Sequence, residues 1–127
     1  MLRDHPAYAI LPTADLERLR RFYEHQLGFA PREETPAGIY YAAGSGTLFA
    51  ITRQSGKASG THTQLGFRVD DIVAEVSELR SRGVKFEDYE SPRTIEGIAE
   101  VPVGRAAWFA DPDGNIVGII EFSKQPD

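Results

Sequence analysis

Apolar residues in the first half of the chain pass from the spacing of a strand to the spacing of a helix. A short apolar run at residues 7–11 predicts a strand. Apolar side chains then recur at helical intervals, at Leu16, Leu19, Tyr23 and Leu27. Asp15 or Thr13 can accept hydrogen bonds from the free N–H groups of this helix, and Gly28 can take the left-handed conformation after it. The pattern therefore predicts a strand followed by one amphipathic helix.

The second half of the chain repeats this order. Alternating apolar residues predict a strand at Leu65, Phe67 and Val69. Asp71, next to Asp70, follows as the helix cap, and Gly83 marks the helix end. The separation of Asp15 from Asp71 equals that of Gly28 from Gly83 to within one residue. This agreement indicates an internal repeat.

Each half then closes with a predicted hairpin. The hairpin strands are expected at residues 39–42, 48–52, 106–110 and 116–121. Turns rich in glycine, aspartate and proline separate them, at 44–46 and 111–115. A further strand is expected to open directly after each helix, at Phe29 and at Val84. Two βαβββ units result.

We therefore expect an α+β fold with modules at residues 5–53 and 64–123. Residues 54–63, rich in Ser, Gly and Thr, are expected to link them. A chain of 127 residues is the size of one domain, so 1–127 is predicted to form a single domain. A ferredoxin-like βαββαβ domain is the alternative, but it lacks the extra hairpin in each half.

Composition narrows the range of partners. The net charge is −5 and the 14 Lys and Arg are scattered, which argues against binding to nucleic acid. There is no cysteine, so disulfides, thiolate metal sites and cysteine nucleophiles are excluded. Residues 1–10 fit neither a signal peptide nor a spanning helix. We expect a cytoplasmic protein that has no membrane partner.

Four segments, taken together in their order along the chain, resemble a known family pattern. They are 15–29, with Phe22-Tyr23 and Leu27-Gly28-Phe29, then 67–72, 79–84 and 109–116, with Asp111-Pro112-Asp113-Gly114-Asn115. The pattern is similar to that of the vicinal oxygen chelate superfamily, which groups glyoxalase, bleomycin-resistance and extradiol-dioxygenase proteins. The resemblance implies paired glyoxalase-type modules forming a curved mixed sheet cup. In its enzymes, His, Gln or Glu side chains from the strands hold a divalent metal in that cup.

Counting from the helix caps and turns locates the metal-ligand positions that the resemblance implies. They fall at Tyr8, Ala50, Gln64 and Gly118. Only Gln64 offers an oxygen without ionising, and an amide oxygen alone is a weak ligand for a divalent ion. We therefore expect no metal, no other cofactor and no catalytic residue, and we assign all four positions to binding a small organic ligand.

Tyr40 and Trp108 complete the predicted ligand-binding set. They stand on corresponding hairpin strands, where aromatic side chains could line a flat apolar pocket or pack in the core. Strand alternation requires Tyr40 and Tyr41 to face opposite sides. It also places Glu121 on the opposite side of the sheet from residue 118.

Two features leave alternatives open. His62 could serve as a base or a displaced metal ligand, or it could be an idle loop histidine. Residues 92–104 form a longer connection, which could be a flap over the cup or a plain loop.

The resemblance to the bleomycin-resistance branch predicts a metal-independent small-molecule binding protein. Members of that branch are typically homodimers in which the interface completes the cup. The acidic net charge favours a cationic ligand. The alternatives are a metal-dependent lyase, isomerase or dioxygenase with displaced ligands, and an interaction module without a ligand.

Overall fold

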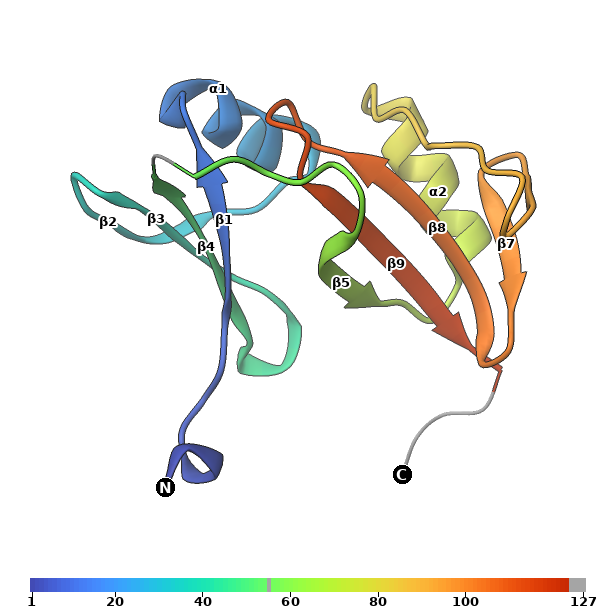
Figure 1. The fold of residues 1–127 in the computed structure, drawn as a ribbon, viewed down its shortest axis with the longest axis horizontal. Helices are drawn as coiled ribbons and strands as arrows, with labels where there is room; N and C mark the ends of the chain where they lie inside the picture. The colour runs from blue at the N-terminus through green and yellow to red at the C-terminus, as the bar shows by residue number, and fades with distance from the viewer. Residues whose placement is uncertain (55, 124–127) are drawn as a thin grey trace. The chain divides into compact units, whose positions relative to one another are not determined.

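The computed structural model describes residues 1–54 and 56–123. The chain forms two compact units, Met1–Ala58 and Ser59–Asp127, and each is a β-sheet with a helical segment (Figure 1). Arg53 ends the last strand of the first unit, and Thr63, the last residue of the expected linker 54–63, begins the first strand of the second. Ser55 of that linker and residues 124–127 lie outside the described residues.

The first unit is a four-stranded sheet of order β1-β4-β3-β2. Strands β1 and β4 are parallel, and the other neighbours are antiparallel. Its elements are η1 (Leu2–Asp4), β1 (Ala9–Thr13), α1 (Leu16–Arg21), η2 (Phe22–Gln26), β2 (Pro31–Glu34), β3 (Gly38–Ala42), η3 (Gly44–Gly46) and β4 (Leu48–Arg53).

The second unit has a five-stranded sheet of order β5-β9-β8-β7-β6. Here β5 and β9 are parallel, as β1 and β4 are in the first unit. Its elements are β5 (Thr63–Arg68), α2 (Ile72–Ser81), β6 (Thr94–Ile95), β7 (Ile98–Val101), β8 (Gly104–Ala110) and β9 (Ile116–Phe122). The two mixed sheets match the predicted α+β class and paired βαβββ modules.

The predicted helix ends are confirmed in both units. The Asp15 side chain accepts a hydrogen bond from the Arg18 backbone N–H, and Asp71 accepts one from Ala74, each at 3.1 Å. Gly28 and Gly83 have φ of 84° and 88°, the left-handed conformation that glycine adopts without steric cost.

Several element boundaries differ from the predictions, and the strand expected to open at Phe29 begins at Pro31. The first strand begins at Ala9 rather than residue 7, and the first helix passes at Phe22 into the π-helical turn η2. No strand opens at Val84, because its N–H bonds back to the Leu79 carbonyl and closes the helix end. The expected connection 92–104 instead supplies β6 and β7, and β7 pairs with β8.

An aromatic cluster fills the core of the first unit. The Tyr23, Tyr41 and Phe49 side chains are fully buried, and the Phe49 ring centroid lies 5.5 Å from that of Tyr23 and 5.3 Å from that of Tyr41. The Tyr41 hydroxyl donates to Glu24 Oε2 at 2.9 Å. Burial, and then this bond, raises the pKa of Tyr41. Arg20 also pairs with Glu24, at 2.9 Å, so the cluster is joined to the helical segment.

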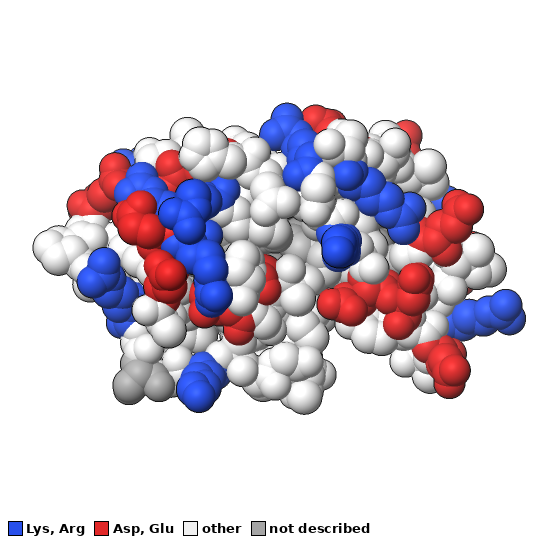
Figure 2. All heavy atoms as spheres, turned by 90° about the horizontal axis from the view of Figure 1, so that it is seen from above, with Lys and Arg blue, Asp and Glu red and all other residues white. Residues whose placement is uncertain are grey.

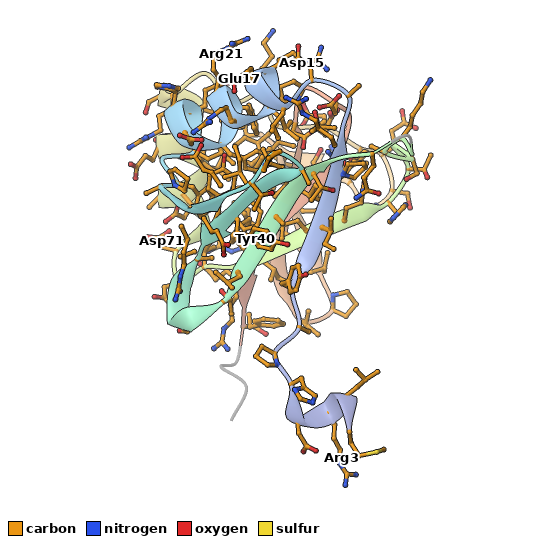
Figure 3. All side chains as sticks on the ribbon, turned by 90° about the vertical axis from the view of Figure 1, so that its left-hand side faces the viewer. Arg3, Asp15, Glu17, Arg21, Tyr40 and Asp71 are labelled. Atoms are coloured by element: carbon orange, nitrogen blue, oxygen red, sulfur yellow. The ribbon has the colours of Figure 1, made fainter. Side chains whose placement is uncertain are left out.

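Tyr40 lies on the other face of the same sheet, as strand alternation predicted. It is partly exposed, whereas Tyr41 beside it is fully buried. Figure 3 shows Tyr40 on the sheet, well below the helix that carries Glu17 and Arg21. One face of this sheet therefore carries the core, and the other carries Tyr40.

Charged side chains of both signs are interspersed on the face of the molecule drawn in Figure 2. Neither Lys and Arg nor Asp and Glu form a continuous stripe there. Among residues 1–54 and 56–123, no helix is long and apolar enough to cross a membrane.

Candidate functional site

A cavity of about 460 Å³ opens in the second unit. Its lining consists of Gly60, Thr61, His62, Thr63, Tyr89, Ser91, Pro92, Trp108 and Ile116. Trp108 and Phe109 are neighbours on β8 and point to opposite faces of the sheet. Phe109 is buried in the core against Phe86, with ring centroids 5.6 Å apart, and this leaves Trp108 for the cavity.

Two aromatic rings form one side of the cavity. The Trp108 and Tyr89 ring centroids lie 5.6 Å apart at 70°, an edge-to-face contact. Tyr89 comes from the segment before β6, and Glu87 in that segment donates its backbone N–H to the Trp108 carbonyl at 2.8 Å. Burial, and then the charge of Glu87, raises the pKa of Tyr89.

Thr94 fixes the backbone of Tyr89. The Thr94 hydroxyl accepts the Tyr89 backbone N–H at 2.9 Å and lies 2.9 Å from Asp88 Oδ1, to which it donates. The same Asp88 oxygen accepts the backbone N–H of Gly97 at 3.2 Å. The β6–β7 hairpin is thus tied to the segment that carries the Tyr89 ring.

The polar side chains of the lining are hydroxyls and the imidazole of His62. Thr61, Thr63 and Ser91 contribute hydroxyls, and no Asp, Glu, Lys or Arg of the described part of the chain lines the cavity. His62 Nδ1 lies 2.6 Å from the Ser59 hydroxyl, which also accepts the backbone N–H of Thr61 at 3.2 Å. With Nδ1 engaged, Nε2 is the imidazole nitrogen left for a ligand. The cavity therefore combines an aromatic side with hydrogen-bonding groups.

Of the predicted site residues, Trp108 and Gly118 lie together in the second unit. They are paired across β8 and β9, and a Cβ built on Gly118 would lie 3.2 Å from Trp108 Cδ1. Gln64 stands beside the lining residue Thr63, where the register between β5 and β9 shifts, but it does not line the cavity. Its Oε1 is buried without a hydrogen-bond partner.

The other predicted residues, Tyr8, Tyr40 and Ala50, lie on one face of the first unit. The Tyr8 and Tyr40 ring centroids are 5.8 Å apart, and Tyr40 pairs with Ala50 across β3 and β4. A hydrogen bond between the two phenols is the main cause that raises the pKa of Tyr40. Tyr8 is 47% exposed, whereas Ala50 is buried. The structure thus groups the six predicted residues by unit, with three in each.

Several cavity residues were not predicted from the sequence. Tyr89, Ser91 and Pro92 come from a segment with no periodic pattern, so no spacing pointed to them. The one available signal was an aromatic residue shortly before Ser91-Pro92, a dipeptide that favours a turn.

The residues at the superfamily's ligand positions do not fit a chelated divalent ion. Ala50 and Gly118 carry no donor atom in their side chains, and the Trp108 indole lies against Gly118. Over the described part of the chain, no three His, Asp or Glu side chains gather into a set that could hold a metal.

Glu121 faces the helix side of the sheet, as its odd offset from Gly118 predicted. Its Oε1 accepts the backbone N–H of Ile72 at 3.1 Å, at the beginning of α2, and its Oε2 accepts from Arg105 Nη2 at 2.8 Å. The bond from Arg105, followed by the one from Ile72, lowers the pKa of Glu121. Glu121 therefore stabilises the beginning of α2 by accepting a backbone N–H there.

The sequence and the fold together identify the family. The model of the Glyoxalase/Bleomycin resistance protein/Dioxygenase superfamily matches residues 4–119, and the chain belongs to this superfamily. Proteins with curated descriptions give no sequence match.

Solved structures share the fold over almost the whole chain. TnmS3, an antibiotic binding protein from Streptomyces sp. CB03234, is 29% identical, with 94% of this chain and 96% of that one covered and a TM-score of 0.73. A glyoxalase/bleomycin resistance protein from the same organism is also 29% identical, with 91% and 99% covered and a TM-score of 0.68. A glyoxalase/bleomycin resistance protein/dioxygenase from Nocardioides is 20% identical, with 97% and 87% covered and a TM-score of 0.73.

Proposed function

We propose that this protein binds a small, flat, uncharged organic molecule in the cavity of its second unit, without a metal ion. The observation that carries the proposal is the side of the cavity formed by Trp108 and Tyr89, since the described residues of the lining include no Asp, Glu, Lys or Arg. An exposed face of an indole binds flat apolar surface well, since aromatic contact adds to the burial of area.

The size and chemistry of the cavity suit such a ligand. Pockets for small organic molecules have volumes of about 300–1,000 Å³ and combine apolar walls with a few polar groups. This cavity, about 460 Å³, falls in that range. The hydroxyls of Thr61, Thr63 and Ser91 and Nε2 of His62 are the groups that would orient a ligand by hydrogen bonds.

The lining changes the charge expected of the ligand. The net charge of the whole chain favours a cation, because its electrostatic field raises the concentration of cations near the protein. That field does not supply an anionic group to pair with a cation inside the cavity. Among residues 1–54 and 56–123, no carboxylate lines the cavity to pair with a cation. An uncharged ligand avoids the cost of burying an unpaired charge there.

The comparisons support binding of this kind. TnmS3, at 29% identity over nearly the full length of both chains, is described as an antibiotic binding protein. We take from this likeness the general role, retention of a small organic molecule, and leave the compound open. Tyr8, Tyr40 and Ala50 of the first unit do not line this cavity and stay ligand-binding residues predicted from the sequence.

The proposal includes a homodimer, as the family resemblance implies, and a cytoplasmic location. Tyr8 and Ile10 are 47% and 48% exposed, and these apolar side chains suit contact with a second copy. Analytical ultracentrifugation decides the first point. A sedimentation coefficient of a dimer supports it, and a monomer at all concentrations contradicts it.

A thermal-shift screen tests ligand binding. The panel contains uncharged fused-ring compounds such as coumarin and acridone, with cationic fused-ring compounds such as proflavine beside them. We expect an uncharged compound to raise the melting temperature of the wild-type protein, because a ligand that binds only the folded state stabilises it. The Trp108→Ala variant should lose this shift and the control Trp108→Phe should retain part of it. Absence of any shift across the panel contradicts the proposal.

A further inference from the structure

Gly118 lies so close to the indole of Trp108 that even a Cβ would make tight contacts there. A Cβ built on it would be 3.2 Å from Trp108 Cδ1 and 3.3 Å from Trp108 Nε1. On its other side the same Cβ would be 3.2 Å from Thr63 Cγ2. These distances are shorter than ordinary van der Waals contact, so at least one neighbour would have to move.

Gly66, the neighbouring glycine on the same face of the sheet, has space for a side chain. Gly66 pairs with Gly118 across β5 and β9, so both residues face the same side of the sheet. A Cβ on Gly66 would meet only the Gly118 carbonyl oxygen, at 4.0 Å, which is an ordinary contact. The tight fit is therefore a property of residue 118 and not of glycine in this part of the sheet.

We propose that Gly118 is a specificity-determining residue, because its missing side chain allows the Trp108 indole to lie against β9 and so sets the width of the cavity. The inference rests on the proposed function and names what selects the ligand by size. Both side chains that approach position 118, Trp108 and Thr63, line the cavity. A methyl group at 118 pushes them toward the space that a ligand would occupy.

Tyr89 limits how the indole can respond. It contacts Trp108 edge to face at 5.6 Å, and its backbone is held by Thr94. An indole lifted from β9 therefore has to move against Tyr89 or into the cavity. In either case the cavity becomes narrower, so a three-ring ligand loses more affinity than a two-ring ligand.

Intrinsic fluorescence tests the inference without any ligand. Trp108 is the only tryptophan in the chain, so the emission reports on this indole alone. In the full-length Gly118→Ala variant we expect a red-shifted emission maximum and stronger quenching by acrylamide than in wild type, with Gly66→Ala unchanged. A Gly118→Ala spectrum and quenching constant equal to those of wild type would overturn the inference.

A second measurement compares the stability loss that Gly118→Ala causes with and without the Trp108 side chain. We expect Gly118→Ala to lower the melting temperature in the wild-type background and to do so less in the Trp108→Ala background, where the space is free. An equal loss in both backgrounds contradicts the inference. This comparison needs no ligand, so the outcome for Gly118 is separate from that of the proposed function.

Binding then tests the effect on size selection. With coumarin and acridone as probes, Gly118→Ala should reduce affinity for the three-ring acridone about tenfold relative to coumarin, the scale of one added methylene in a packed pocket. An unchanged ratio of the two affinities counts against Gly118 as the size-selecting residue. The wild-type protein could bind neither probe while the fluorescence of Gly118→Ala still shifts. The proposed function then fails for these compounds, whereas the inference that Gly118 sets the position of the Trp108 indole is supported.

Discussion

Asp15 and Asp71 hold the same position in the two units of the chain. Each lies directly before a helix and accepts the backbone N–H of the residue three positions further on, at 3.1 Å in both cases. Their backbone angles also agree, with φ of −137° and −135°. The repeat in the sequence therefore corresponds to a repeat in the way each helix begins.

Both caps should contribute similarly to stability. We expect Asp15→Ala and Asp71→Ala each to lower the free energy of unfolding by about 1 kcal/mol, because each leaves a helix N–H without its side-chain acceptor. Asp15→Asn and Asp71→Asn are the controls, since asparagine also caps well. Urea unfolding measures the difference. Alanine variants as stable as the asparagine variants would show that the caps do not act in this way.

Tyr41 and Tyr40 provide a matched pair on opposite faces of β3. Tyr41→Phe removes the bond to Glu24 in a buried setting and should lower the free energy of unfolding by about 1 kcal/mol. Tyr40→Phe removes a hydroxyl from a partly exposed residue and should stay within about 0.5 kcal/mol of wild type. Chemical unfolding of the two variants measures both free energies of unfolding. Equal losses of stability would contradict the placement of Tyr41 on the core face of β3 and of Tyr40 on the other face.

Glu121 should make stability depend on pH in the acid range. Its pKa is lower in the folded protein because of the bonds from Arg105 and Ile72, so the unfolded chain takes up the proton first as pH falls. Its contribution is complete above the ordinary glutamate pKa of about 4.3 and is lost as pH falls through the lower folded value. Urea unfolding as a function of pH should show a smaller acid loss for Glu121→Gln than for wild type. Parallel curves would exclude this role.

Thr94 should hold the Tyr89 side of the cavity. Thr94→Val keeps the shape but removes the hydroxyl that joins Tyr89 and Asp88, and should lower the free energy of unfolding by about 1 kcal/mol because the partly buried backbone N–H of Tyr89 loses its acceptor. Thr94→Ser retains the hydroxyl and should recover most of the stability. Equal melting temperatures for the valine and serine variants would contradict this role.

The local chemistry of the sequence was enough to predict the repeated framework. Asp15, Asp71, Gly28 and Gly83 each have a conformational or hydrogen-bonding reason for their position, so their spacing carried information about the fold. The hairpin strands followed from alternation and turn residues in the same way. The strand expected at Val84 was wrong because the hydrogen bonds that close α2 extend to that residue.

The site was harder to predict because it depends on segments without periodicity. Gly118 was located by counting from the turn and Trp108 by its place on a predicted hairpin strand, and the structure places them against each other. Tyr89 reaches the cavity from an irregular segment fixed by Thr94 and Glu87, and those bonds join residues through the fold rather than through a pattern. Sequence spacing therefore located the regular part of the site and missed the irregular part.

Equilibrium dialysis of chelator-treated protein tests the central claim, binding without a metal, most directly. The purified chain is dialysed against EDTA and then against the compound that gave the largest thermal shift, still in EDTA. We predict saturable binding of one molecule per chain, with the same affinity after addition of zinc, nickel, manganese or iron, and loss of binding in Trp108→Ala. Binding that disappears in EDTA and returns only with a divalent ion would contradict the account and favour a metal-dependent member of the superfamily.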